Sequence, residues 1–261
     1  MARFCSLFSS SRGNCTYIGD AHSGILIDCG VSTKRTDEAL RSVGVEAGSI
    51  RAILITHEHT DHVSGLRVFA SRYGIPVFAS DGTLSAMEQM DIFNGKFPVD
   101  PIERQGKEIG GMYIRPFSLS HDARQPVGYT VETTDGRRVA VATDTGIVTH
   151  EILSAISGSD LVLLESNHDV GMLQNGPYPY PVKRRILSDF GHLSNDACAE
   201  TAVRLLESGT TRFCLAHLSQ ENNMPPLAYA CTHSEFQMNG AAEGTDYLLS
   251  VAGGEPEMIL F

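Results

Sequence analysis

The stretch His57-Glu58-His59-Thr60-Asp61-His62 decides how the rest of this chain is interpreted. It follows an apolar, β-branched run over residues 50–55, which predicts a buried strand. Apolar residues at helical spacing then continue as far as Gly74. The hexapeptide is therefore predicted to be a loop between a strand and a helix. Three imidazoles and a carboxylate on one short connection can turn toward a common point, which favours a metal site over a solvated loop that is merely rich in histidine.

The hexapeptide offers more ligands than one metal ion can use. A single tetrahedral Zn²⁺ has no room for four such side chains together with further ligands and an open position for water. The surplus predicts a pair of divalent ions that share the loop. Zn²⁺ suits the imidazole-rich set, and Mn²⁺ remains an alternative because carboxylates contribute and cells select metals by availability.

The composition of the chain predicts one large domain. Its 261 residues are 42% hydrophobic, with no internal repeat or linker, so we expect a single domain over residues 1–261. The formal charge of −11 argues against a protein that coats nucleic acid electrostatically, although bound cations would offset part of it where a substrate binds. Without a signal peptide or a run of membrane-spanning length, we expect a soluble, cytoplasmic protein with reduced cysteines.

Three later apolar runs each predict a strand that ends in a possible ligand. His121 follows residues 112–120, Asp144 follows residues 138–143, and His217 follows residues 212–216. Taken singly, each could be an ordinary loop histidine or turn aspartate. Together they supply what the hexapeptide lacks.

The combined residues predict two ion sites with one shared carboxylate. One ion would take His57, His59 and His121, the other Asp61, His62 and His217, with Asp144 bridging the two. Asp28, at the end of an apolar run, could support the site from behind its ligands or could simply form the turn before Gly30.

The remaining elements are predicted from periodicity and turn residues. Residues 4–8, 16–18 and 24–28 predict a β-meander, and residues 33–43 and 83–90 predict helices. A third helix is expected between Ser194 as N-cap and Gly209 as the stop. Residues 97–108 are expected to be irregular, and residues 166–186 to be the least globular stretch.

The order of these motifs resembles the metallo-β-lactamase superfamily over essentially the whole chain. The resemblance rests on HxHxDH, a later histidine, an aspartate in a TDTG setting and a histidine at a late strand end. It implies a mixed α/β (α+β) fold, a four-layer αββα sandwich with the metals at one edge between its sheets. No inserted cap domain of the kind found in larger nucleases of the superfamily is expected.

His192 stands just before the helix expected after Ser194. This placement is similar to that in ribonuclease Z and related nucleases, where such a histidine contacts the scissile phosphate. An imidazolium beside a helix N-terminus would favour an anionic phosphate. The alternative is a histidine that serves only solubility at the start of the helix.

The stretch of residues 166–186 combines prolines, tyrosines and the one dense basic cluster. Tyrosine faces beside cations suit stacked bases and phosphates, whereas a proline-stiffened surface loop with a solvated tip is equally compatible. The residues considered for substrate binding are Tyr178, Tyr180, Lys183, Arg184 and Arg185.

Longer motifs, among them FCSLFSSSRGNC, ESNHD and LAHLSQENN, resemble the YycJ-type or WalJ-like group of metallo-hydrolases. That resemblance implies a cytoplasmic bacterial nuclease, a group associated with 5′-to-3′ exonuclease action on double-stranded DNA and with DNA repair. We therefore expect a dinuclear metal-dependent phosphodiesterase that acts on nucleic acid, with DNA expected as the substrate in preference to RNA. Asp61 would orient the attacking hydroxide, and His192 would stabilise charge on the phosphate or leaving oxygen.

Two other classes remain open at this point. The same scaffold could hydrolyse a small ester, thioester or lactam in the cytosol. It could also be a non-catalytic metalloprotein that binds a regulator, although a scaffold has no need for an open, water-bearing pair of ions. The sequence predicts no oligomeric state.

Overall fold

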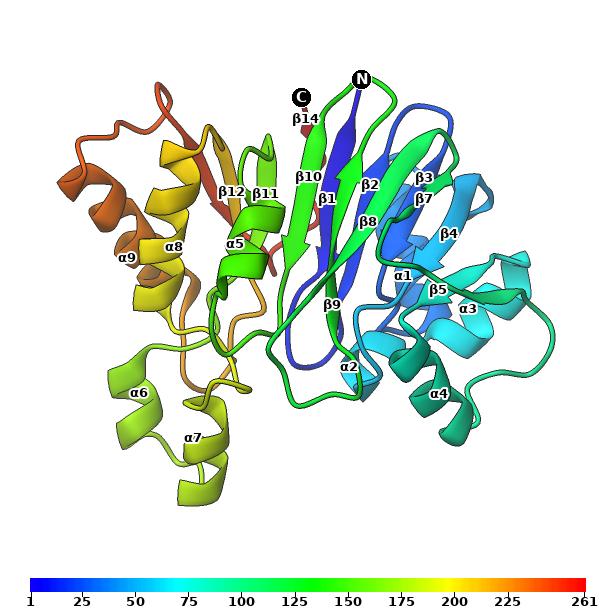
Figure 1. Ribbon diagram of the computed structural model, residues 1–261, viewed down its shortest axis with the longest axis horizontal. Helices are drawn as coiled ribbons and strands as arrows, with labels where there is room; N and C mark the ends of the chain where they lie inside the picture. Colours follow the sequence, from blue (N-terminus) through cyan, green and yellow to red (C-terminus); the bar gives the residue numbers. More distant parts are fainter. The chain divides into compact units, whose positions relative to one another are not determined.

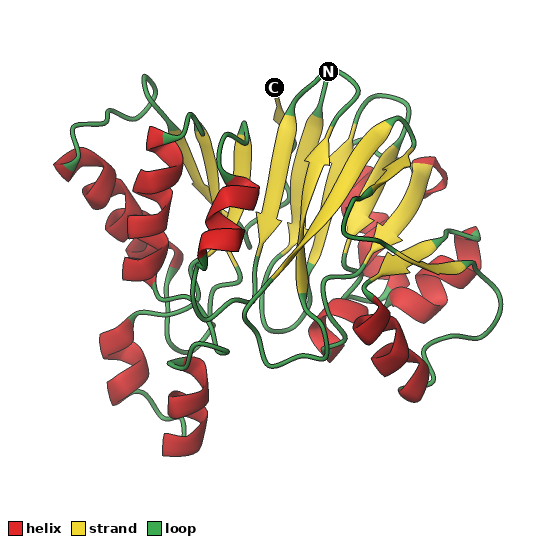
Figure 2. Ribbon diagram, in the orientation of Figure 1, coloured by secondary structure: helices red, strands yellow, loops and turns green.

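The computed structural model describes residues 1–261 and divides into two compact units. Unit 1 comprises Met1–Pro116, Ala123–Arg137 and Gly253–Phe261, and unit 2 comprises Phe117–Asp122 and Arg138–Ala252. The strands fall into two seven-stranded sheets accompanied by helices (Figures 1 and 2). The predicted mixed α/β class with two helix-flanked sheets is confirmed, whereas the single domain over the whole chain stays a prediction.

Unit 1 contains a complete seven-stranded sheet. Its strands in spatial order are β14 (Ile259–Leu260), β1 (Arg3–Phe8), β2 (Cys15–Gly19), β3 (Gly24–Ile27), β4 (Ile50–Leu54), β5 (Val77–Ala79) and β6 (Val99–Pro101). The predicted meander is confirmed, because β1, β2 and β3 pair antiparallel in sequence. From β3 to β6 the pairing is parallel, so the ends of β3 and β4 lie at the same edge.

The helices of unit 1 follow the apolar periodicity of the sequence. They are α1 (Thr33–Ser42), the short 3₁₀ helix η1 (Ala47–Ser49), α2 (Thr60–Val63), α3 (Leu66–Tyr73) and α4 (Asp81–Gln89). Helix α3 ends at Gly74 in a left-handed conformation with φ 64°, as the sequence predicts. Helix α4 begins earlier than predicted because the Ser80 hydroxyl caps it by accepting from the Thr83 amide.

The prediction that residues 97–108 are irregular is wrong. This segment contains β6 and the start of β7 (Lys107–Ile109), which pairs with β8 (Met112–Ser118) across a turn of two glycines with positive φ. Strand β6 forms because its backbone pairs with β5, a tertiary cause that its own sequence pattern does not carry. Strand β9 (Val127–Glu132) completes the strands of this unit.

Unit 2 is built on four parallel strands. They lie in the order β13 (Leu248–Val251), β12 (Arg212–Ala216), β11 (Leu161–Glu165) and β10 (Arg138–Ala142). Every residue of β11 is buried, as expected for a central strand of a parallel sheet with both faces covered. The helices packed in this unit are α5 (His150–Ile156), α8 (Asn195–Glu207) and α9 (Pro225–Met238).

Two features of unit 2 test the sequence predictions. The helix expected after Ser194 is confirmed as α8, capped by the Ser194 hydroxyl, which accepts from the Ala197 amide. The expectation that residues 166–186 are the least globular is only partly met, because they include α6 (Val170–Asn175) and α7 (Tyr180–Ile186). The Asp169 side chain caps α6, and α7 has Pro181 in its first turn, where proline is well tolerated.

None of the helices combines the length and the apolar character that crossing a membrane requires.

Candidate metal centre

The hexapeptide lies at the end of β4, as the sequence predicts. Its first three residues form the connection, while Thr60 begins α2, so that Asp61 and His62 belong to the first turn of a helix instead of a loop. His57 and His62 are fully buried, and His59 and Asp61 are half-buried. The helix turns Asp61 and His62 away from the direction of the preceding residues, which is how neighbours in sequence come to present several ligands at once.

The imidazoles of the hexapeptide converge. His57 Nε2 lies 3.1 Å from His59 Nδ1, and the ring centroids of His57 and His62 are 4.1 Å apart. Asp61 Oδ2 lies 3.3 Å from His62 Nε2. Nitrogen and oxygen donors therefore gather within unit 1 at the place where the sequence predicts ligands.

Asp28 supports this group from behind. Its carboxylate is 3% exposed, accepts from the Thr56 amide at 2.9 Å, and lies 2.8 Å from His62 Nδ1. Because a carboxylate can only accept, His62 donates through Nδ1, and the lone pair of the ring is on Nε2. The supporting role considered for Asp28 is thus the one that the structure favours, even though its φ of 63° also makes the turn.

Glycines allow α2 to lie directly against the strand ends. A Cβ atom on Gly30 would stand 1.6 Å from the Asp61 carbonyl oxygen, and one on Gly65 would stand 1.7 Å from the Val31 carbonyl oxygen. The Asn14 amide donates to the same Asp61 carbonyl at 2.8 Å. No side chain fits at either glycine, so these close approaches fix where Asp61 is held.

A second group lies within unit 2. Its members are buried or nearly so, each offers a ligand atom, and those atoms lie within 4.8 Å of one another: Asp144, Glu165, His192 and His217. Asp144 Oδ1 lies 3.3 Å from His217 Nδ1 and 3.7 Å from His192 Nδ1. Of the predicted residues in this unit, the structure therefore brings Asp144, His192 and His217 together.

Glu165 is the member that sequence reasoning missed. It is fully buried at the end of β11, and its Oε1 lies 2.8 Å from Nδ1 of both His192 and His217. Its Oε2 accepts from the Thr145 amide at 2.8 Å and the Leu193 amide at 3.2 Å. The signal was present, because an apolar run ending in a carboxylate is the arrangement that predicted Asp144.

The environment of Glu165 keeps it ionised. Burial alone would raise the pKa of this carboxyl group, but the charge of His192 and hydrogen bonds from His192 and His217 outweigh burial and lower the pKa. An ionised carboxylate between two imidazoles makes both rings donate through Nδ1 and present Nε2 on the opposite side.

His121 is oriented by the backbone. Its Nδ1 lies 3.0 Å from the Gly191 carbonyl oxygen, and its Nε2 lies 3.9 Å from Asp144 Oδ1. Burial lowers the pKa of His121, which the nearby Asp144 carboxylate only partly opposes. A neutral imidazole of this kind has the form that a metal requires.

The donor set fits divalent metal ions. In four of the predicted histidine ligands, Nδ1 lies within 3.0 Å of an oxygen atom that belongs to the same unit. The pairs are His57 with Thr56 Oγ1, His62 with Asp28, His121 with the Gly191 carbonyl, and His217 with Glu165. Metal-binding histidines characteristically donate their second nitrogen in this way, because the bond fixes the tautomer and orients the ring. Buried imidazoles and carboxylates suit Zn²⁺ or Mn²⁺.

The residues considered for substrate binding lie on or beside α7. Tyr180 is 72% exposed. Lys183 Nζ donates to the carbonyls of Gln174 and Gly176, both at 2.8 Å, so it ties α7 to the end of α6. Tyr178 is half-buried and Arg184 is exposed. Arg185 makes a two-point ion pair with Asp122, in which Nη2 lies 2.8 Å from Oδ1.

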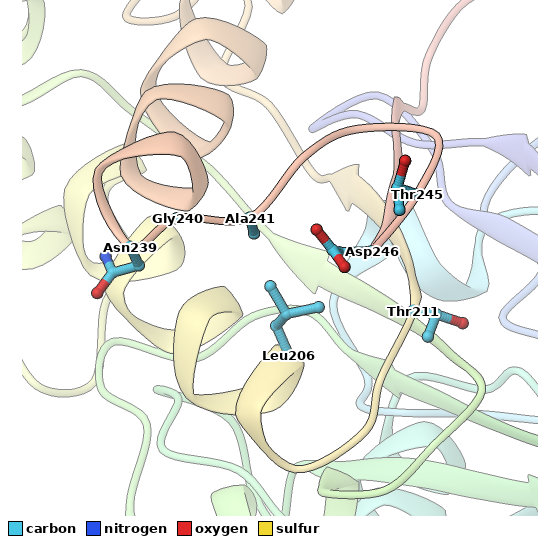
Figure 3. Close-up of a pocket in the computed structure, with 7 residues that line it drawn as sticks. All are labelled: Leu206, Thr211, Asn239, Gly240, Ala241, Thr245 and Asp246. Atoms are coloured by element: carbon cyan, nitrogen blue, oxygen red, sulfur yellow. The ribbon is translucent and has the colours of Figure 1, made fainter.

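A separate pocket in unit 2 has none of this chemistry (Figure 3). Its volume is about 470 Å³, and its lining residues are Leu206, Thr211, Asn239, Gly240, Ala241, Thr245 and Asp246. Its single carboxylate, Asp246, already accepts from the Ala242 amide at 2.8 Å. With no imidazole or thiol in its wall, this pocket is not a candidate metal site.

Comparison with known proteins identifies the family of the chain. Residues 24–218 match the family described as Beta-lactamase superfamily domain. Exodeoxyribonuclease YycJ of Bacillus anthracis is 38% identical over 245 residues, which cover 92% of this chain and 91% of that protein. Exodeoxyribonuclease WalJ of Streptococcus pneumoniae is 36% identical over 251 residues, which cover 94% of this chain and 92% of that protein.

A solved structure agrees on the fold. The crystal structure of the metallo-β-lactamase fold protein YhfI from Bacillus subtilis matches with a TM-score of 0.75 and 13% identity over 100% of both chains. The family match, the relatives and the fold are all consistent with a metal-dependent protein, as are the buried groups of His and Asp side chains. The chain belongs to the β-lactamase superfamily and is, within it, a YycJ/WalJ-like hydrolase that depends on divalent metal ions.

Proposed function

We propose that this hydrolase is a dinuclear phosphodiesterase acting on nucleic acid, and in particular a 5′-to-3′ exonuclease of double-stranded DNA that serves DNA repair. The observation that carries the proposal is His192, held by the buried Glu165 carboxylate at 2.8 Å and placed two residues before the Ser194 cap of α8. A positioned imidazole beside a helix N-terminus suits an anionic phosphate. The two exodeoxyribonuclease relatives, which match over more than nine-tenths of this chain, add support.

The ligand assignment in this proposal follows the sequence. His57, His59 and His121 would hold one ion, Asp61, His62 and His217 would hold the other, and Asp144 would be shared by the two. Zn²⁺ is the first choice because imidazoles dominate, with Mn²⁺ as the alternative. When bound, such ions polarise a phosphoryl oxygen and make hydroxide available near neutral pH.

The chain's own residues orient the reactants. Asn14 Nδ2 donates to Asp61 Oδ2 at 3.1 Å, so one oxygen of Asp61 is fixed and the carboxylate can orient the attacking water. Glu165 holds Nδ1 of His192, which leaves Nε2 to donate to a phosphate oxygen or to protonate the leaving oxygen. Glu165 stays ionised throughout, so it stabilises the imidazolium form of His192 without taking its proton.

The α6–α7 segment supplies the grip on the polymer in this proposal. Tyr178 and Tyr180 offer ring faces to bases, and the basic cluster offers cations to phosphates: Lys183, Arg184 and Arg185. Lys183 and Arg185 also have partners within the chain, so Arg184 is the residue of the cluster that we assign to direct phosphate contact.

Digestion of end-labelled substrates tests the function. Single- and double-stranded DNA and RNA, labelled at either end, are incubated with added Zn²⁺ or Mn²⁺. We expect mononucleotides to be released first from the 5′ ends of duplex DNA. His192→Ala is the matched variant, and it should keep its metal content and lose about 10²-fold in turnover, as for removal of a preorganised charge-stabilising group.

Other outcomes would contradict the proposal. Loss of metal from His192→Ala would make His192 a ligand and put the assignment of His217 in question. Hydrolysis of thioesters or lactones, with every nucleic acid left intact, would establish the small-molecule alternative instead.

A further inference from the structure

Phe190 is an exposed aromatic residue close in sequence to His192, the proposed catalytic histidine. It is 60% exposed and precedes His192 by two residues in the connection between α7 and α8. A single exposed apolar side chain is unremarkable on most surfaces. Here the position adjoins a buried cluster of titratable side chains, because Phe190 stands two residues before His192.

The backbone on both sides of Phe190 is fixed. Its carbonyl accepts from the Asp122 amide at 3.1 Å, and the next carbonyl, that of Gly191, lies 3.0 Å from His121 Nδ1. The His192 amide donates to the Ile186 carbonyl at 3.0 Å. A Cβ atom on Gly191 would stand 2.2 Å from that same carbonyl oxygen, so only glycine allows this close approach. The ring therefore projects from a rigid segment tied to His121 and His192.

An exposed strip on α7 precedes Phe190 in the chain. Tyr180, Arg184 and Leu187 are spaced by four and three residues, so they share one helix face, and all three are exposed. The strip combines a ring face, a guanidinium and an aliphatic side chain, in a chain whose formal charge is −11. A ring face beside a cation complements a nucleotide strand, with its stacked bases and phosphates, better than an uncharged protein surface or a lipid.

We propose that Phe190 stacks on the nucleobase adjoining the scissile phosphodiester and so positions the strand at His192. The proposal rests on the proposed nuclease function and adds the group that reads the base. Stacking is tolerant of sequence because every base has a π face, so it suits an enzyme that removes successive nucleotides. A rigid aromatic side chain loses little conformational entropy when it makes such a contact.

The test removes the ring and the base in turn. Phe190→Ala is compared with Phe190→Trp, which keeps a stacking face, and with Val68→Ala, which truncates a residue of unit 1 that is 61% exposed. The substrates are duplex DNA, the same duplex with an abasic tetrahydrofuran residue at the cleaved nucleotide, and methyl 4-nitrophenyl phosphate, which has no base.

The expected pattern is specific to stacking. Phe190→Ala should lower kcat/KM on normal duplex by about tenfold, as base–aromatic contacts do on truncation. Phe190→Ala should leave kcat/KM unchanged on the abasic duplex and on the small diester. Phe190→Trp and Val68→Ala should have the kcat/KM of the wild type on every substrate. The wild type should lose the same factor on the abasic duplex.

Three results would overturn the inference, and they are distinguishable. Equal losses by Phe190→Ala on all three substrates would mean that the ring supports the fold, and no loss on any would mean that it contacts no substrate. In both cases the nuclease proposal survives. If the wild type hydrolyses the small diester but no nucleic acid, the nuclease proposal fails, and the role of Phe190 fails with it.

Discussion

Glu165 determines how two histidines of unit 2 are presented. One of its oxygens serves His192 and His217 at 2.8 Å each, while the other is held by two backbone amides. The amides fix the carboxylate, and the carboxylate fixes the rings. A single buried side chain thus links a proposed metal ligand to the proposed catalytic imidazole, and neither ring can reorient without breaking a charge-assisted bond.

Replacing this carboxylate should disturb the rings without unfolding the site. Glu165→Gln keeps the size of the side chain but has only one acceptor oxygen and adds an NH₂ group, so it can accept from the two histidines or from the two backbone amides, and its NH₂ group then faces the other pair of donors. We expect kcat on duplex DNA to fall by about 10²-fold, with a smaller change in KM and weaker metal binding by about 10-fold or more. Steady-state kinetics and metal titration measure the two effects.

Glu58→Gln is the matched control, since Glu58 belongs to the hexapeptide and its Oε1 accepts from the Arg124 amide at 2.7 Å. It makes the same change of charge, and its amide oxygen can keep that bond. If both variants retain full activity, Glu165 does not position His192.

Individual residues differ in how much of their role could be predicted. The six residues of HxHxDH predict their own convergence, because chain connectivity alone keeps them close. Asp28 was open to two roles, and only the 2.8 Å contact with His62 distinguishes them. Glu165 was missed because a glutamate that closes an apolar strand is also a common boundary residue, and its bonds to residues 27 and 52 positions away exist only in the fold.

At the scale of elements, α7 carries two kinds of basic residue. Lys183 donates to two carbonyls at the end of α6 and so holds the two helices together, while Arg184 lies on the exposed face with Tyr180. The contacts of Lys183 make it structural, whereas the exposed Arg184 is the residue that we propose for recognition.

This division predicts opposite results for two neighbouring substitutions. Arg184→Ala should weaken DNA binding and reduce the slope of log Kd against log salt by about one, with little change in Tm, because it removes one phosphate contact. Lys183→Ala should lower Tm, because two carbonyls lose their donor. Fluorescence anisotropy across a salt series, in a His192→Ala background to prevent digestion, and thermal melting measure both. A smaller salt slope for Lys183→Ala than for Arg184→Ala would reverse the assignment.

Elements were predictable where burial imposes a pattern. The runs that became β4, β10 and β12 are apolar because both faces of a parallel strand are covered. Strand β6 was not predictable in this way, because two of its three residues are exposed. It is a strand because its backbone pairs with β5. Helices α6 and α7 were not predicted, because residues 166–186 contain prolines and glycines. These residues occur at the ends of helices as well as in loops, so the sequence does not distinguish the two.

At the scale of the whole molecule, the buried His168 makes stability depend on pH. It is 1% exposed, and neither ring nitrogen has a hydrogen-bond partner. Burial, together with the smaller effect of the charge of His192, lowers the pKa of His168 to about 4. The negative charges of Glu165, Asp169 and Asp196 raise this pKa, but by less. The unfolded chain binds a proton at this position between about pH 6.5 and 4, and the native state does not.

The free energy of unfolding should therefore fall as pH falls through this window. The difference in pKa corresponds to about 3 kcal/mol. Glu165 adds a second loss at lower pH, because its native pKa lies below the unfolded value. Urea denaturation of metal-free protein between pH 7 and 4 measures the trend. His168→Asn should flatten it, and the exposed His22→Asn should not; identical profiles for the two variants would show that His168 does not cause the loss.

The assignment of the whole chain to its superfamily was predictable from motif order, and the family comparison confirms it. The two sheets with their helices are confirmed as well. The single domain and the shared ligand set could not be settled by pattern, because they depend on contacts between segments distant in sequence. Spacing along the chain constrains such contacts only weakly.

The backbone is left-handed at three residues of the candidate metal centre: Asp28, Asp144 and His217. These residues have φ of 63°, 65° and 57°, and they make up three of the four non-glycine residues with positive φ in the chain. Glycine would adopt that conformation with less strain, so stability alone does not explain the side chains found there. Asp28 lies 2.8 Å from His62, and Asp144 lies 3.3 Å from His217, so the strain is tolerated for the contacts that these side chains make. Local backbone strain is thus concentrated at the candidate metal centre.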